Sequence, residues 1–139
     1  MSIVYLTRIY RFNAGHRLYH PQRDDAWNWE TYGKCSYPEG HGHNYVLELT
    51  VSGPPDPSTG QCVVPEVLDS VVELEVMERL DHRNLNTALE LRYGPAPTTE
   101  VLLLELWDRL APHFNPPTRL ARLRISETAK NIFEYSGEG

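Results

Sequence analysis

The sequence predicts an α+β fold, in which a four-stranded antiparallel sheet carries two helices on one face in the chain order β-β-α-α-β-β. Three observations predict it: strand-like segments at both ends of the chain, two helical stripes between them, and turn-rich breaks that separate the segments. The 139 residues, 40% of them hydrophobic, suit one domain with one core, which we expect to span residues 1–139. The free edges of such a sheet would invite pairing with other subunits.

The first two strands have different sequence patterns. Residues 3–16 are rich in β-branched and aromatic side chains, and the even positions from Tyr10 to His16 share one face of a regular strand. Residues 43–51 alternate more clearly, with apolar side chains at every second position from Tyr45. The turn-rich stretch SGPPDPSTG, residues 52–60, ends this second strand.

Two helices are expected in the middle of the chain. Pro65 suits the first turn of a helix, and apolar residues then recur four apart from Leu68 to Leu80. The second helix begins near Thr98 and runs through VLLLELWDRL, with a proline on either side. Both helices have an apolar stripe that a sheet can cover.

The last two strands are RLARLRISE, residues 119–127, and NIFEYSG, residues 131–137, with a short polar turn between them. Glu127 has the parity of Leu123 and Ile125, so a carboxylate occupies the apolar face of its strand. A carboxylate is costly there unless it is paired. Glu127 therefore either faces a ligand or forms a buried salt bridge with one of the nearby arginines.

The composition argues against several classes of protein. A formal net charge of −6 argues against a nucleic-acid or anionic-membrane binder, because neither surface attracts an acidic protein. Arg8 and Arg11 interrupt the stretch that a signal peptide would need, and no later run is long enough to span a membrane. We therefore expect a cytoplasmic protein without nucleic-acid or membrane partners. Its two cysteines make a poor disulfide framework and should remain thiols.

A metal site is indicated by the spacing of three histidines. His41 and His43 are two apart, so an extended backbone places both imidazoles on the same side. His16 could supply a third nitrogen if the two strands are neighbours, which would give the three-ligand, open arrangement of a catalytic zinc. Two alternatives stay open: His16 caps a strand while His41 and His43 lie in a polar loop, or Cys35 is the fourth ligand of a closed structural site.

Three further segments have both a chemical and a structural interpretation. Asp81 and His82 follow the first helix. They could form a proton relay, or they could simply end the helix with a cationic cap. Thr99 and Glu100 fit ordinary capping of the second helix, where the helix dipole favours a carboxylate. Cys62 has no comparable neighbours, and we expect it in the core.

The motifs together resemble the family of 6-pyruvoyl-tetrahydropterin synthases and 6-carboxy-tetrahydropterin synthases. The resemblance covers nearly the whole chain, and the motifs occur in the family's order: AGHRL (14–18), YGKCSYPEGHGHNY (32–45), LDHRNLN (80–86), PTTE (97–100) and SETAKN (126–131). It implies the T-fold, or tunnelling fold, in which sheets of several subunits join into a barrel. It also implies a homo-oligomer, a trimer or hexamer, with active sites at subunit contacts.

The resemblance further implies roles for individual residues at the metal. The Zn²⁺ ligands would be His16, His41 and His43. Cys35 would be the catalytic thiol, and Asp81 with His82 would form its relay.

The substrate pocket is also implied by the resemblance. Glu127 would hold the pterin ring and belong to the catalytic set, with Thr99 and Glu100 near the same pocket. An acidic protein needs local cations for a triphosphate, and the basic residues that flank the motifs are the candidates: Arg17, Lys34 and Arg83.

The implied activity is that of a zinc-dependent carbon–oxygen lyase of tetrahydrobiopterin biosynthesis. It would convert 7,8-dihydroneopterin triphosphate to 6-pyruvoyl-tetrahydropterin with elimination of triphosphate. One alternative is the 6-carboxy-tetrahydropterin synthase of queuosine biosynthesis, whose members commonly have three residues between the cysteine and HGH; here there are five, 36–40. Another is a non-catalytic, zinc-stabilised pterin-binding module. Residues 63–66, VVPE, depart from the family's pattern at the start of the first helix.

Overall fold

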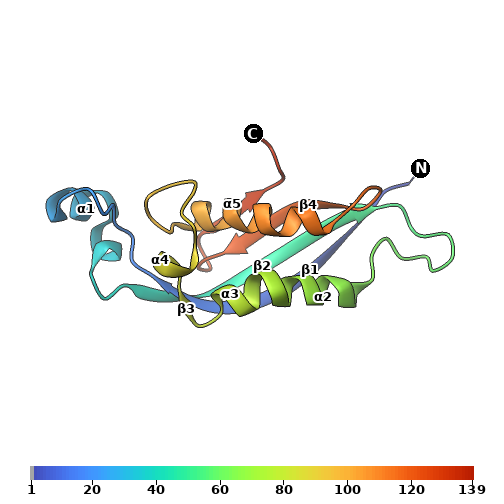
Figure 1. The fold of residues 1–139 in the computed structure, drawn as a ribbon, viewed down its shortest axis with the longest axis horizontal. Coiled ribbons are helices and arrows are strands. Elements are labelled where there is room, and N and C mark those ends of the chain that lie inside the picture. Colours follow the sequence, from blue (N-terminus) through green and yellow to red (C-terminus); the bar gives the residue numbers. More distant parts are fainter. Residues whose placement is uncertain (1) are drawn as a thin grey trace.

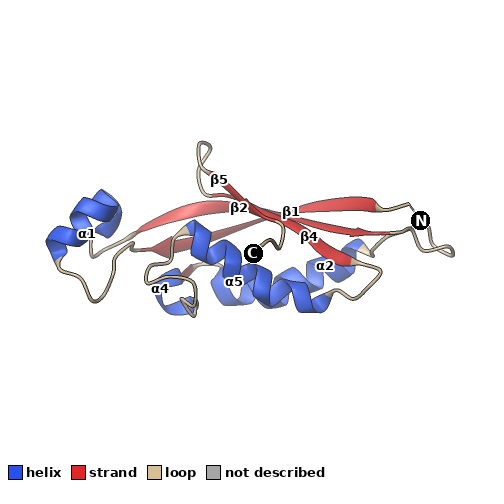
Figure 2. Cartoon of the chain, turned by 90° about the horizontal axis from the view of Figure 1, so that it is seen from above, coloured by secondary structure: helices blue, strands red, loops and turns tan. Residues whose placement is uncertain are grey.

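The computed structural model describes residues 2–139 and has one mixed sheet with helices on one face (Figures 1 and 2). Four antiparallel strands form most of the sheet: β1 (Val4–His16), β2 (His41–Gly53), β4 (Arg119–Ser126) and β5 (Ile132–Tyr135). A two-residue strand, β3 (Arg83–Asn84), pairs parallel with β1, so that the strand order is β3-β1-β2-β4-β5. The predicted α+β class and its antiparallel strands are confirmed, and β3 is an addition.

The two long helical segments lie on the same face of the sheet (Figure 2). The first is continuous over α2 (Pro65–Val72), a π-helical turn η2 (Glu73–Met77) and α3 (Glu78–Leu80). The second is α5 (Thr99–Leu110), whose capping residue Thr98 accepts a hydrogen bond from the N–H of Val101. Both begin where the sequence predicts, because proline and a hydroxyl cap set their first turns.

The core lies between this face of the sheet and the helices. Alternate side chains of β2 from Tyr45 to Val51 are fully buried, as are the residues of the α2–α3 stripe, Leu68, Val76 and Leu80. The opposite face of the sheet is open in the single chain, where Tyr5 of β1 is 62% exposed. The sheet therefore has one face that folding buries and one that it leaves available.

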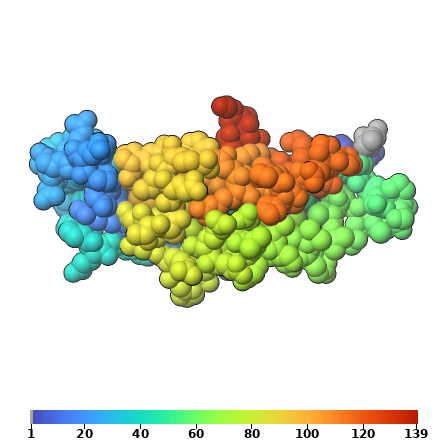
Figure 3. Space-filling view, viewed as in Figure 1, coloured from blue at the N-terminus to red at the C-terminus, as the bar shows by residue number. Residues whose placement is uncertain are grey.

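Several short elements were not predicted. They are α1 (Asp25–Tyr32), the 3₁₀ turns η1 (Gly33–Ser36) and η3 (Ala111–His113), and α4 (Leu85–Ala88). Helix α1 lacks a clear apolar stripe, and its start is fixed by Asp24, whose side chain accepts a hydrogen bond from the N–H of Trp27. Figure 3 shows the α1 segment as a lobe at one end of an elongated molecule.

Two smaller expectations need correction or comment. Strand β2 begins at His41 rather than His43, so the whole His-Gly-His segment is part of the sheet. Cys62 is half-buried beside the turn before α2, and the expectation that it lies in the core is wrong. Its carbonyl accepts a hydrogen bond from the Thr118 hydroxyl. Within residues 2–139 we find no helix long and apolar enough to cross a membrane.

Candidate functional site

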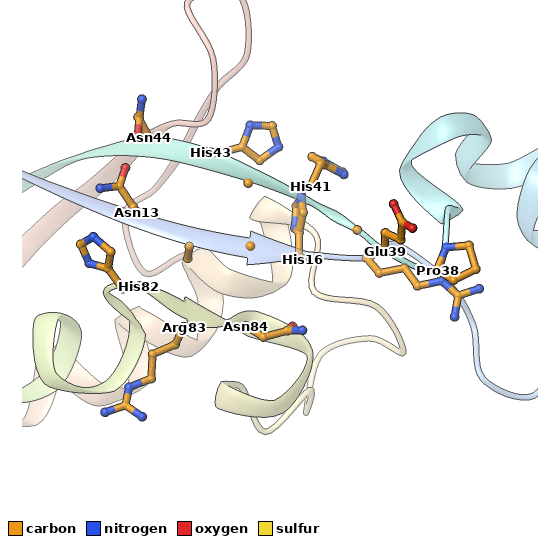
Figure 4. Close-up of a pocket in the computed structure, with 15 residues that line it drawn as sticks. Asn13, His16, Pro38, Glu39, His41, His43, Asn44, His82, Arg83 and Asn84 are labelled. Carbon is orange, nitrogen blue, oxygen red and sulfur yellow. Dashed lines mark hydrogen bonds between the residues drawn. The ribbon is translucent and has the colours of Figure 1, made fainter.

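Strand pairing brings the three histidines together. In the antiparallel register of β1 and β2, His16 is directly opposite His41, and Ala14 is opposite His43. Directly opposed residues point to the same face of a sheet, and residues two apart on one strand do so as well. Each imidazole offers a ring nitrogen within 4.8 Å of the others (Figure 4). His41 and His43 are both part of β2, so the interpretation that they lie in a polar loop is wrong.

The ring of His16 is held in one orientation by the backbone. Its Nδ1 lies 2.8 Å from the carbonyl oxygen of Pro97, and a carbonyl can only accept, so Nδ1 carries the proton. Its Nε2 is then unprotonated, with a lone pair free to accept, and lies 3.1 Å from Nε2 of His41. Burial is the main cause that lowers the pKa of both His16 and His43. Both rings are therefore neutral near pH 7, as metal ligands must be.

This donor set fits a metal ion. Three imidazole nitrogens converge, and one of the three rings has the backbone hydrogen bond on its other nitrogen that metal-ligating histidines usually make. Three protein nitrogens leave a position for a further ligand. Among the residues that the structure describes, Cys35 does not belong to this group.

Glu127 lies close to the histidines, immediately after the end of β4. Its N–H donates to the Asn131 carbonyl at 3.0 Å, and the Thr99 hydroxyl donates to its carboxylate. Its charge partly offsets the effect of burial on the pKa of His16 and His43. Within residues 2–139 no arginine forms a salt bridge with Glu127, and the nearby Arg124 pairs with Glu48 instead. The predicted salt-bridge alternative is therefore wrong.

Tyr45 lies under this group, next to the ring of His43. Its ring centroid is 5.5 Å from that of His43, and its side chain is fully buried. Burial, and then the nearby charge of Glu127, raises the pKa of the Tyr45 hydroxyl. The tyrosine hydroxyl therefore stays neutral, and its ring packs against that of His43.

Asp81 and His82 lie at the end of α3, beside β1. Asp81 Oδ1 accepts the N–H of Asn13 at 2.9 Å and lies 3.1 Å from His82 Nδ1. The hydrogen bond from Asn13 is the main cause that lowers the pKa of Asp81. His82 has φ +59°, and its imidazole is exposed. The pair thus combines a structural contact of the aspartate with an exposed imidazole.

An open cleft of about 600 Å³ joins the three histidines to His82, and its size suits a small molecule. The three histidines form its centre, and His82 with Arg83 lies at one end while Pro38 and Glu39 lie at the other (Figure 4). Amides and one more cation complete the lining: Asn13, Arg17, Asn44 and Asn84. The cleft therefore offers cations and hydrogen-bond donors around the metal-binding nitrogens.

Six of the predicted site residues lie outside the lining of this cleft: Lys34, Cys35, Asp81, Thr99, Glu100 and Glu127. Cys35 is on η1, where its carbonyl accepts the N–H of Leu18 at 2.8 Å, so it lies behind the end with Pro38. Lys34 and Glu100 are exposed and also do not line it. The single chain therefore does not assemble Cys35 with Asp81 and His82, which flank the histidines from the other end.

Sequence reasoning missed the Pro97 carbonyl and the amides of the cleft. A backbone acceptor leaves no trace in residue type, so no sequence signal could have found Pro97. Asn84 lies in the LDHRNLN motif, but its place at the cleft depends on the parallel pairing of β3 with β1. That pairing is only two residues long and has no sequence pattern of its own.

Comparison with known proteins gives similarity over nearly the whole chain. A family model described as 6-pyruvoyl tetrahydropterin synthase matches residues 5–138. The chain is 42% identical over 135 residues to the 6-pyruvoyl tetrahydrobiopterin synthase of Drosophila melanogaster, covering 97% of this chain and 80% of that one. With the Homo sapiens protein of the same name it is 37% identical over 133 residues, covering 96% and 91%. A solved structure of Caenorhabditis elegans 6-pyruvoyl tetrahydropterin synthase superposes with a TM-score of 0.89 at 37% identity, covering 99% and 98%.

Proposed function

The chain belongs to the 6-pyruvoyl tetrahydropterin synthase family, as its motifs predict, and from that premise we propose that it is a zinc-dependent lyase. It has the T-fold of the family, with a sheet that is unclosed in the single chain. The proposed reaction converts 7,8-dihydroneopterin triphosphate to 6-pyruvoyl-tetrahydropterin and releases triphosphate. The observation that carries the proposal is the convergence of His16, His41 and His43 in a cleft next to Glu127.

Zinc is the proposed metal, held by the three histidines. When bound, it would supply positive charge that acidifies the hydroxyls and the adjacent C–H bonds of the substrate side chain. The nitrogen set favours zinc among common metals but also accepts other transition ions. Metal analysis of the purified protein therefore has to accompany the activity measurement.

Binding of the pterin is assigned to Glu127. A carboxylate can accept two hydrogen bonds from the amino-pyrimidine edge of the ring, and the Thr99 hydroxyl already holds one carboxylate oxygen in place. Arg17 and Arg83 line the cleft and are the proposed partners of the triphosphate, since the acidic chain needs local cations for it. Lys34 and Glu100, which are outside the cleft of the single chain, stay secondary candidates.

Proton movement is assigned to Cys35, with Asp81 and His82 as its relay. As a thiolate, Cys35 would take and return protons on the substrate side chain while the C–O bond to triphosphate breaks. The remaining steps are tautomerisations, so the side chain is oxidised and the ring reduced without a nicotinamide. Because Cys35 lies on η1, outside the cleft that His82 lines, we propose that association of subunits completes the site.

A homo-oligomer is part of the proposal for this reason. The uncovered face and free edges of the sheet offer surfaces for other copies of the chain, and Ile9 on β1 is 55% exposed there. In a closed barrel those edges would pair between subunits. Size measurement in solution should give a trimer or hexamer.

The 6-carboxy-tetrahydropterin synthase activity is the second candidate, because it uses the same set of residues. The five residues between Cys35 and His41 favour the pyruvoyl reaction. The similar proteins of Drosophila melanogaster and Homo sapiens, which are 6-pyruvoyl tetrahydrobiopterin synthases, favour it as well. Incubation with 7,8-dihydroneopterin triphosphate and mass analysis of the pterin product tests the choice. A three-carbon side chain supports the proposal, a one-carbon carboxy product supports the second candidate, and binding without turnover supports a pterin-binding module.

A further inference from the structure

We propose that Glu105 of α5 is a positioning residue for the metal site. Its carboxylate holds the loop of residues 89–98, and this loop presents the carbonyl that orients His16. The inference rests only on the metal-binding part of the proposed function. It does not depend on which pterin the protein uses.

Glu105 is a buried carboxylate with backbone partners. Its residue is 1% exposed, and burial of a carboxylate is costly unless it is hydrogen-bonded. Its two oxygens accept the N–H groups of Glu90 at 2.8 Å and Leu91 at 2.6 Å. Arg109, one turn further along the helix, lies 3.9 Å away and supplies the nearest guanidinium. Both hydrogen bonds of the Glu105 carboxylate are therefore made to the backbone of the loop.

The loop connects α4 to α5, as the yellow segment between them in Figure 1 shows, and its residue Pro97 contacts His16. It starts with a bend at Leu91, a non-glycine residue at φ +58° that needs support from its surroundings. Further on, Gly94 passes so close to α5 that a Cβ there would lie 3.1 Å from Val101 Cγ2. The loop then ends in the buried pair Ala96 and Pro97.

Pro97 is where the loop acts on the metal site. Its carbonyl accepts the Nδ1–H of His16 at 2.8 Å, and that hydrogen bond determines which nitrogen faces His41 and His43. Partners of this kind typically account for 10-fold to 100-fold of metal affinity when they are disturbed. A carbonyl cannot be replaced by mutation, but the loop that carries it can be released through Glu105.

Other contacts to the loop are weaker anchors. Asp108 accepts hydrogen bonds from the side chains of Arg92 and Tyr93, all on the outside of the loop. Such exposed pairs contribute little. Glu105 instead holds two backbone N–H groups away from water, where loss of the acceptor leaves both unsatisfied.

The test compares two variants with two controls in the full-length protein. Glu105→Gln keeps the side-chain volume but turns one acceptor into a donor, and Glu105→Ala removes both acceptors. Asp108→Asn makes the same carboxylate-to-amide change on the same helix, at the exposed contacts. Leu68→Ala opens the core under α2, far from the loop, and reports what a general loss of stability does to metal binding.

Two readouts are needed, and neither uses substrate. Zinc affinity is measured by competition with a chromophoric chelator, and the Nδ1–H proton of His16 is followed by NMR in the metal-free protein. We expect about tenfold weaker zinc binding and an exchange-broadened or shifted His16 proton in Glu105→Gln. Glu105→Ala should weaken zinc binding at least as much. The zinc affinities of Asp108→Asn and Leu68→Ala should remain within about twofold of the wild-type value.

Two results would overturn the proposal. One is a Glu105→Gln protein with unchanged zinc affinity and an unchanged His16 proton. The other is an equal loss of zinc affinity in Leu68→Ala, which would make the effect one of stability alone. If the wild type itself binds no metal, the metal part of the proposed function fails, and the His16 proton still decides the role of Glu105.

Discussion

His16 and His41 face each other across two strands, with their Nε2 atoms 3.1 Å apart. Two protonated nitrogens cannot face each other at this distance, so at most one of them is protonated. The proton of His16 is on Nδ1, where it is donated to the Pro97 carbonyl. Two ring nitrogens are thus brought close together beside the ring of His43, and burial lowers the pKa of both His16 and His43. Such an arrangement is stabilised when a metal cation binds the lone pairs of the three ring nitrogens.

The first prediction concerns the ligand set. His43→Ala should lose stoichiometric zinc, because two imidazoles cannot hold the ion as three do. Cys35→Ala should keep it, since Cys35 lies outside the cluster. The measurement is zinc per chain by elemental analysis, with His113→Ala as the control histidine outside the site. Loss of zinc from the Cys35 variant would indicate a closed structural site instead.

The second prediction concerns pterin recognition. Glu127→Gln replaces an acceptor oxygen with a donor and leaves a ring N–H unpaired, so pterin binding should weaken by roughly 2 kcal/mol. Isothermal titration with a pterin gives the affinity. Glu134→Gln makes the same change on an exposed side chain of β5 and should leave the affinity as it is. Equal affinities for the two variants would exclude Glu127 from the binding site.

The third prediction concerns the attachment of α2 to the sheet. Tyr10 donates a hydrogen bond to Asp69 at 2.7 Å, and Arg8 makes two contacts of 3.0 Å to the same carboxylate. Tyr10→Phe should lower the free energy of unfolding by about 1 kcal/mol, the usual net value of such a bond. Urea denaturation measures it. Tyr5→Phe, on the open face, should change nothing.

The fourth prediction is the pH dependence of that contact. Burial, followed by the hydrogen bond to Asp69, raises the pKa of Tyr10 to about 12. A raised pKa means that the stabilising effect is complete below the unfolded value of about 10 and is lost as the pH rises through 12. The stability difference between wild type and Tyr10→Phe should therefore be constant from pH 7 to 9 and shrink above pH 10. A difference that stays constant up to pH 12 would place Tyr10 in water, because an unshifted hydroxyl titrates alike in the folded and unfolded states.

Much of the fold could be predicted because hydrophobic periodicity and capping are local signals. The alternation from Tyr45 and the four-residue spacing from Leu68 identify the strand and helix that form the core. The parity of Glu127 also placed its carboxylate on the buried face of β4, although only the structure shows that Thr99 rather than an arginine is its partner. Each of these inferences needs only the residues of one element.

The remaining features depend on contacts between distant segments. Helix α1 has too weak a stripe to predict, and β3 exists only because it pairs with β1. The hydrogen bond from His16 to Pro97 joins residues 81 apart through a backbone atom. The position of Cys35 outside the cleft follows from the packing of η1 against Leu18, which the motif YGKCSYPEGHGHNY does not encode locally.

The most direct test of the proposed lyase is triphosphate release from 7,8-dihydroneopterin triphosphate by the zinc-loaded protein, compared with Cys35→Ala and Cys62→Ala. The wild type and Cys62→Ala should release one triphosphate for each 6-pyruvoyl-tetrahydropterin formed. Cys35→Ala should bind substrate with little loss of affinity and turn over about 10²-fold to 10⁴-fold more slowly, because a general base acts in the transition state. Turnover by Cys35→Ala at near the wild-type rate, or wild-type protein that binds the substrate without releasing triphosphate, would contradict it.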